Sequence, residues 1–219
     1  SGHTAGLLRL GLPQRRADEL LPQVLAEFQA AYPEVRVQTV SPPCAELERM
    51  LLGSELDMAL ISGEADNDKL DYQLIASDEV VLLAGRKTKL AQRIPSGSTV
   101  SLSACEGERF VLPAETLPFA RAYDELLARA GLSPFVALRT DDSQCAKRVC
   151  AGGSLVMLCP FITLLSDTPA MQQLSHYRLS DTLFAPLYMA HPKDMPLTPY
   201  AQTLHAMMSN RFRAMTAYR

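Results

Sequence analysis

The sequence predicts an α/β protein with two lobes. Short apolar segments alternate with helical stripes of apolar residues along the 219-residue chain, both before and after a polar stretch at 85–99. Strands that alternate with helices form mostly parallel sheets with helices on both faces. The length suits this organisation, because two lobes of about 100 residues each are of ordinary domain size.

Residues 7–61 predict a β-α-β-α-β unit. Its first helix carries apolar residues at steps of three and four, among them Leu20, Val24 and Phe28. Pro33 cannot continue that helix, and Gly53 ends the second one. Right-handed crossovers make this part a doubly wound lobe. The expected elements are strands at 7–12, 35–40 and 57–61 and helices at 17–31 and around 47–51, followed by two more strands at 73–76 and 80–83.

The second half repeats this logic. Asp141 or Asp142 can cap a helix that runs to Ala151. The other expected elements are strands at 109–112, 135–138, 155–158 and 183–189, a helix with its apolar stripe at 120–127, and a terminal helix with its stripe at 204–215.

The charge balance and the cysteine content exclude some classes of function and indicate the redox compartment. Lys plus Arg number 21 and Asp plus Glu number 24, for a net charge of −3, so this chain has no basic excess for binding duplex nucleic acid. The five cysteines are odd in number and lack metal-ligand spacing, which favours a reducing, cytoplasmic compartment over a disulfide framework. The longest uncharged run, 149–166, contains two glycines and a proline, so we expect a buried helix–turn–strand passage and no membrane segment.

Four segments in the first sixty residues stand in the order and spacing of a known family. They are 6–11 (GLLRLG), 20–28 (LLPQVLAEF), 32–35 (YPEV) and 51–60 (LLGSELDMAL). With them, the whole chain resembles the effector-binding domain of LysR-type transcriptional regulators. The later segment 149–160 is similar to the family's Val-x-x-Gly-x-Gly strand entry, although Ser154 stands where a second glycine is usual and Pro160 falls one place late.

The resemblance implies two Rossmann-like lobes in the periplasmic-binding-protein type 2 architecture, joined by a two-strand hinge with a cleft between them. Lobe I then comprises 4–84 plus 187–219, and lobe II comprises 85–186. The family's N-terminal winged helix-turn-helix DNA-binding domain lies outside this sequence. A small effector, anionic if arginine holds it, is expected in the cleft.

The resemblance also implies partners. The effector signal would reach DNA only through the missing domain, by way of homodimer geometry, or tetramer geometry in the full-length protein. In relatives, the helices corresponding to 17–31 and 117–130 meet across an antiparallel dimer; the alternative is that their outer faces are plain solvent surface.

Candidate effector contacts follow from the topology, because ligands of open α/β sheets bind at the carboxyl ends of strands, beside helix N-termini. The expected contacts in these turns are Pro13, Gln14, Arg15, Arg16, Ser41, Pro42, Ser62, Leu83, Ala84, Leu112, Pro113, Thr140, Asp141 and Ser143.

Several of these residues have an alternative role. Arg15 or Arg16 can grip an anionic effector, or face solvent, or pair with Asp18 or Glu19. Thr140 can bind ligand oxygens or cap the following helix, and capping is favoured for Ser143.

Nothing in the sequence assembles a catalytic or metal site. The nucleophile-elbow, dinucleotide, P-loop and zincin motifs do not occur, and His176, His191 and His205 are isolated. We therefore expect no enzyme activity, no cofactor and no metal, buried inert thiols, and an Asp57 that accepts backbone N–H bonds. The alternative function is that of an extracytoplasmic solute-binding protein of a transporter, which has the same architecture.

Overall fold

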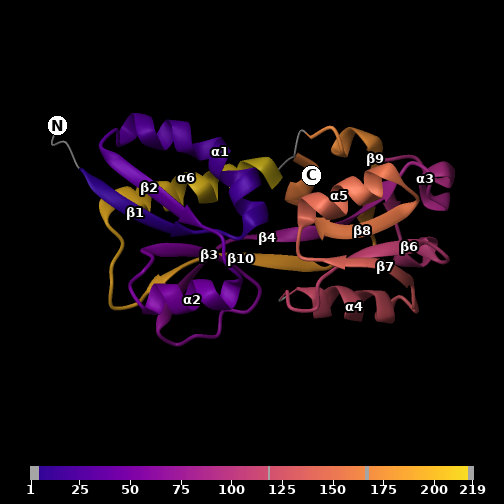
Figure 1. Ribbon diagram of the computed structural model, residues 1–219, viewed down its shortest axis with the longest axis horizontal. Helices are drawn as coiled ribbons and strands as arrows, with labels where there is room; N and C mark the ends of the chain where they lie inside the picture. Colours follow the sequence, from indigo (N-terminus) through magenta and orange to yellow (C-terminus); the bar gives the residue numbers. More distant parts are fainter. Residues whose placement is uncertain (1–4, 118, 166–167, 217–219) are drawn as a thin grey trace. The chain divides into compact units, whose positions relative to one another are not determined.

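The computed structural model describes residues 5–117, 119–165 and 168–216 (Figure 1). The chain divides into two compact units. Unit 1 takes the described residues up to Ser77 and those from Pro186 on, and unit 2 takes those between Asp78 and Ala185. Within the described residues no helix is long and apolar enough to cross a membrane.

Unit 1 contains the predicted β-α-β-α-β unit. Strand β1 is parallel to both β2 and β3, and β10 joins β3 in antiparallel orientation. Helices α1 and α6 lie on one side of these strands and α2 on the other (Figure 1). The bounds are β1 Gly6–Gly11, α1 Gln14–Ala31, β2 Val35–Val40, α2 Cys44–Leu52, β3 Met58–Ser62, β10 Phe184–Pro192 and α6 Pro199–Thr216.

The core of unit 1 comes from the stripes that the sequence predicts. Leu20 and Phe28 of α1 and Leu204 and Phe212 of α6 are fully buried, and Val24 is 2% exposed. Burial of each such side chain is worth about 1.5–3 kcal/mol. The two helices therefore hold together the first and last segments of the chain, as the expected return to the first lobe requires.

Unit 2 builds a second sheet in which β6 is parallel to β7 and β8, while β4 is antiparallel to β8 and β9. Helix α4 covers one face and α5 the other (Figure 1). The bounds are β4 Leu70–Gly85, α3 Lys89–Arg93, β5 Thr99–Val100, β6 Arg109–Pro113, α4 Ala120–Arg129, β7 Phe135–Thr140, α5 Ser143–Gly152, β8 Leu155–Pro160 and β9 Leu174–Leu179. Four short 3₁₀ or strand segments, η1 Leu102–Cys105, η2 Phe161–Leu165, η3 Met171–Gln173 and β5, connect these elements.

Alternate residues of β4 point into two separate cores. Val80 and Leu82 belong to the cluster beneath α4, together with Tyr123. Val81 and Leu83 belong to the cluster beneath α5. This alternation is the two-residue period of a strand that is buried on both faces.

The two strands expected at 73–76 and 80–83 form one continuous strand, β4. The polar residues between them do not break it, because their charges find partners. Asp78 is fully buried and its Oδ2 accepts a bond from the backbone N–H of Ile162, at 3.4 Å. Glu79 is 3% exposed and lies 3.0 Å from Arg178 Nη2.

The boundaries of the units also fall inside strands. The sequence places the passage to the second lobe after 84, whereas the division occurs between Ser77 and Asp78 within β4, and the polar stretch at 85–99 belongs to unit 2. The second division, before Pro186, lies within β10. Strand β9, which pairs with β4, is not predicted from the sequence at all.

Gly85 tests the close approach between β4 and α5. A Cβ atom on Gly85 would lie 2.3 Å from both the Cys150 and Gly153 carbonyl oxygens. Because backbone atoms cannot swing aside, Gly85→Ala should lower the free energy of unfolding by about 2 kcal/mol or more in urea denaturation. Gly152→Ala is the matched control, because no atom lies within 4 Å of its Cβ position. Equal stability of the two variants would contradict the close approach.

His205 makes stability depend on pH. Burial lowers the pKa of this side chain below 6.5, and the nearby His191 and Arg213 lower it further. The unfolded chain therefore binds the proton more readily than the folded one, so the free energy of unfolding should fall as the pH drops below about 6.5. His205→Gln should flatten that slope in denaturant titrations, and an unchanged slope would show that other groups cause it.

Candidate functional site

The carboxyl ends of β1, β2 and β3 meet at one edge of the unit 1 sheet. Gly11 pairs with Val40, the last residue of β2, so the turns after β1 and β2 start side by side, and with Ala59 of β3, which runs on three residues further to Ser62. Two of these turns lead directly into helices, α1 at Gln14 and α2 at Cys44. This is the arrangement on which the prediction of effector contacts rests.

The predicted contacts on α1 have different surroundings. Pro13 precedes the helix, and Gln14 is exposed and donates to Asp18 Oδ1 at 3.1 Å. Arg16 is only 1% exposed, and its guanidinium lies over the Phe212 ring, 5.4 Å from the centroid. This cation–π contact anchors α1 to α6. The side chain of Arg15 lies outside the described residues.

Ser41 and Pro42 lie in the turn after β2, with Ser41 exposed and Pro42 half-buried. Ser62 ends β3, and its Oγ is buried with no hydrogen-bond partner among the described residues. Buried hydroxyls are normally bonded. The Ser62 hydroxyl is therefore a polar group whose hydrogen-bonding capacity the described residues leave unused.

In unit 2 the carboxyl ends of β6 and β7 lie side by side, with Pro113 paired to Thr140. Pro113 is half-buried, and Leu112 is 2% exposed within the core beneath α4. Thr140 Oγ1 accepts a bond from the Asp142 N–H at 3.1 Å. This hydroxyl therefore shapes the turn into α5.

Asp142 caps α5. Its Oδ1 accepts bonds from the N–H groups of Gln144 at 2.8 Å and Cys145 at 3.0 Å. The interpretation of Ser143 as a cap is wrong, because Ser143 is the first residue of the helix and the residue before it already satisfies these donors. Asp141 is exposed beside the cap.

Leu83 and Ala84 do not lie with the other predicted contacts, and this part of the prediction is wrong. Both are fully buried, and Ala84 pairs with Val156 near the start of β8, whereas Val80 pairs with Pro160 at its end. Because β4 runs antiparallel to β8, its last residues lie at the amino-terminal edge of the sheet. The part of β4 at the carboxyl edge of unit 2 is Asp78 to Val80.

The sequence analysis missed a buried lysine in the same unit. Helix α5 buries Ala146, Lys147 and Cys150, and Lys147 is 0% exposed. Among the described residues, no hydrogen-bond partner lies near its Nζ. Its place between two apolar residues of the buried helix face was the only signal in the sequence.

The thiols and carboxylates have mainly structural roles. Burial raises the pKa of Cys105 and of Cys150 to about 12, which keeps both protonated and unreactive as expected. Cys145 is exposed, contrary to the expectation of buried thiols. Asp57 accepts a bond from the Arg9 backbone N–H at 2.7 Å, as predicted, and also pairs with the Arg9 guanidinium at 2.7 Å.

Metal ligands do not gather anywhere in the described part of the chain, where no group of three or more His, Cys, Asp or Glu could hold an ion. His191 Nε2 lies 3.3 Å from Asp71 Oδ2, and its Nδ1 lies 2.9 Å from the Pro192 carbonyl oxygen. This histidine therefore ties β10 to the start of β4 within unit 1.

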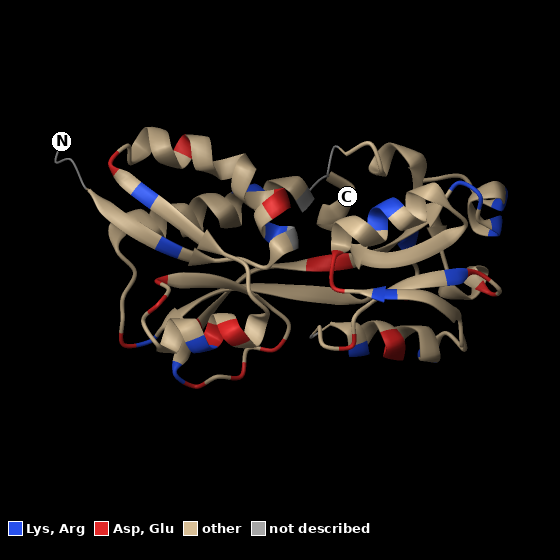
Figure 2. Cartoon of the chain, in the orientation of Figure 1, with Lys and Arg blue, Asp and Glu red and all other residues tan. Residues whose placement is uncertain are grey.

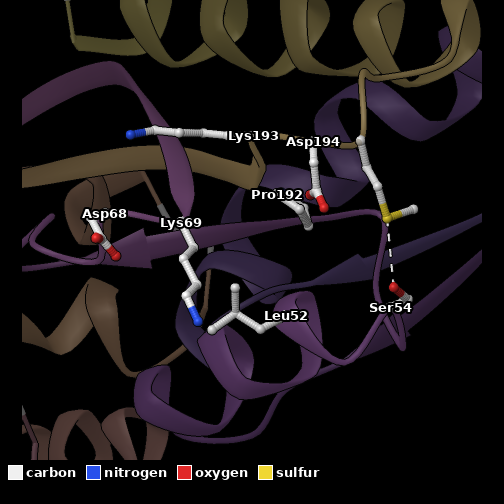
Figure 3. A pocket seen from close by; sticks show the side chains of 8 residues that line it. Leu52, Ser54, Asp68, Lys69, Pro192, Lys193 and Asp194 are labelled. Carbon is white, nitrogen blue, oxygen red and sulfur yellow. Dashed lines mark hydrogen bonds between the residues drawn. The ribbon is translucent and has the colours of Figure 1, made fainter.

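A surface pocket of about 390 Å³ lies elsewhere on unit 1 (Figure 3). Ser54 Oγ donates to Met195 Sδ at 3.6 Å across one end of it. Since Ala190 pairs with Ala59, the pocket residues after β10 lie near the start of β3, away from the carboxyl edge. The lining residues are Leu52, Ser54, Asp68, Lys69, Pro192, Lys193, Asp194 and Met195.

Comparison with known proteins identifies related sequences. The sequence profile described as "LysR substrate binding domain" matches residues 1–213. The uncharacterized HTH-type transcriptional regulator YcgK of Bacillus subtilis (strain 168) is 25% identical over 182 residues, covering 77% of this chain and 56% of YcgK. The transcriptional dual regulator GltC of the same organism is 24% identical over 165 residues, covering 75% of this chain and 54% of GltC. The chain spans about half the length of these relatives.

Solved structures agree on the fold. The regulatory domain of Synechocystis CcmR in complex with 2-PG has a TM-score of 0.79 at 22% identity, covering 94% of this chain and 97% of that domain. The BenM effector binding domain with its effector benzoate has a TM-score of 0.78 at 18% identity, covering 99% and 96%. These likenesses confirm the predicted periplasmic-binding-protein type 2 fold. YcgK and GltC are both described as transcriptional regulators, so these two relatives favour neither an enzyme nor the transporter alternative.

The cap of α5 can be tested by substitution. Asp142→Ala removes the acceptor of two first-turn N–H groups and should lower the free energy of unfolding by about 1 kcal/mol. Asp141→Ala removes the same charge from the neighbouring exposed position and should change stability by less than about 0.5 kcal/mol. Urea denaturation of both variants measures the difference; an equal loss in both would mean that charge rather than capping is responsible.

Proposed function

We propose that this chain, which belongs to the family of LysR substrate-binding domains, is the ligand-sensing domain of a transcription regulator and that its effector is a small molecule held at the carboxyl ends of its parallel strands. The observation that carries the proposal is the shared edge of β1, β2 and β3, where helices start and the Ser62 hydroxyl is buried without a partner. In unit 2, the paired ends of β6 and β7 supply the corresponding turn.

Within this proposal the contacts are the strand-end residues that the sequence analysis names, without Leu83 and Ala84. Exposed Gln14 and Ser41 offer neutral hydrogen-bond groups, and the buried Ser62 hydroxyl offers another. We also propose that Arg15 or Arg16 binds an anionic group of the effector. For Arg16 it requires the guanidinium to bind the effector from its place over the Phe212 ring.

The effector acts by its differential affinity for two conformations of the regulator, because a ligand that binds both equally shifts nothing. We propose that a homodimer, or a tetramer in the full-length protein, transmits the shift, with α1 and α4 as the dimer-forming helices. In this proposal, a segment outside this chain contacts the DNA. This chain itself carries a net charge of −3, which does not favour contact with DNA. Figure 2 shows acidic and basic residues interspersed along both units rather than a basic surface on one element. We also propose that the protein acts in the cytoplasm, where a bacterial transcription regulator meets DNA.

A panel of small metabolites tests this function. A molecule that binds only the folded chain raises its stability by RT ln(1 + [L]/Kd), about 2.7 kcal/mol at a concentration of 100 Kd. We expect at least one member of a panel of carboxylates, amino acids and aromatic acids to raise the unfolding midpoint in a concentration-dependent way. Amide hydrogen exchange should then show protection at 11–16, 41–44, 62–63, 113–116 and 140–145.

Protection confined to the surface pocket that Leu52 and Met195 help to line would place the ligand in that pocket and contradict the proposed strand-end site. Arg15→Ala and Arg16→Ala, titrated with the same ligand, separate the two arginines from the neutral contacts. Unchanged affinity in both variants would remove arginine from the proposal while leaving the strand-end site in place.

A further inference from the structure

We propose that the effector carries a carboxylate or phosphate group that is neutralised by the buried ammonium of Lys147. The inference rests on the proposed function and adds to it the chemical class of the effector. Lys147 is 0% exposed, and its Nζ has no hydrogen-bond partner among the described residues. A buried charge costs several kcal/mol unless it is paired, so the structure calls for an anion that the chain does not supply.

Two other buried charged groups of unit 2 have partners for their charge. Glu79 pairs with Arg178, and Glu108 Oε1 accepts the Leu90 N–H at 2.6 Å. Lys147 differs from these two groups, and the cap of its helix, Asp142, already accepts two backbone N–H groups through its Oδ1.

The position of Lys147 on α5 relates its ammonium to the proposed binding edge. Ser143 begins α5 directly after the end of β7, and Lys147 is four residues further along, about 6 Å on the helix axis at about 1.5 Å per residue. Helical side chains lean toward the N-terminus of their helix. We therefore take the turn that contains Thr140 as the part of the binding edge that an anion held by Lys147 would contact.

Two other polar atoms without partners belong to segments packed around the same apolar cluster. Thr163 is 1% exposed in η2, and neither its Oγ1 nor that of Thr168 has a hydrogen-bond partner. Phe161 and Met171, in η2 and η3, pack against the cluster that contains Ala146. An ammonium and two hydroxyls can all donate hydrogen bonds, and oxygen atoms of an anion accept them.

The experiment compares Lys147→Met, which keeps an unbranched side chain but removes the ammonium, with Arg148→Met, which removes a charge from the neighbouring exposed position. Lys147→Gln provides a second uncharged variant. The probes are benzoate, shikimate, succinate and inorganic phosphate, each at matched ionic strength against benzamide, methyl shikimate, succinamide or chloride. Unfolding midpoints and calorimetric titrations are recorded for every pair.

We expect at least one anion to raise the midpoint of the wild type while its control compound, an uncharged analogue or, for phosphate, chloride, does not. Lys147→Met and Lys147→Gln should lower the affinity for that anion at least tenfold, and Arg148→Met should lower it less than twofold. Without any probe, Lys147→Met should unfold at a higher temperature than the wild type, because it removes an unpaired buried charge.

Several results would overturn the inference. Among them are a midpoint that responds equally to an anion and its control compound, an anion affinity unchanged in Lys147→Met, and a Lys147→Met variant that is less stable than the wild type without any probe. Binding of an uncharged probe at the strand ends would leave the proposed function intact and overturn only the role of Lys147. Absence of any binding by these probes would overturn the role of Lys147, and the wider metabolite panel would decide the function separately.

Discussion

The antiparallel pairing of β4 with β8 determines which residues of unit 2 share an edge. Because β6, β7 and β8 run in one direction, their carboxyl ends lie beside the beginning of the unit 2 part of β4, at Asp78 to Val80. The end of β4 lies at the opposite edge, where Gly85 permits close contact with the end of α5. The parallel pairing of β6 with β7 brings the turns before α4 and α5 to the same edge as Asp78 to Val80.

The strand can take this course only because its polar residues are satisfied. Asp78 and Glu79 are buried in the middle of β4, where each unpaired charge would cost several kcal/mol. The Ile162 N–H and the Arg178 guanidinium provide partners, so the two strands expected from the sequence are joined in one continuous strand. The same requirement for partners draws attention to Lys147 and Ser62, whose polar atoms have none among the described residues.

The difference between satisfied and unsatisfied groups separates structural residues from functional candidates. Asp57, Asp142 and His191 each have defined partners, and their chemistry is used within the fold. Ser62 lies at the end of a parallel strand, and Lys147 lies on a helix that begins at such an end. A binding domain of the LysR family that must recognise a small molecule needs free hydrogen-bonding groups at this kind of position.

The sequence by itself determined the α/β class, the β-α-β-α-β unit at 7–61 and most helices, because apolar periodicity and the stops at Pro33 and Gly53 are local signals. It also located the turns after β1, β2, β6 and β7. Only the tertiary structure decided that 73–76 and 80–83 are one strand, that Leu83 and Ala84 lie at the amino-terminal edge of the unit 2 sheet, and that Lys147 is buried. Strand direction, partners of buried charges and the burial of a long polar side chain depend on segments far apart in the chain, so no local pattern can specify them.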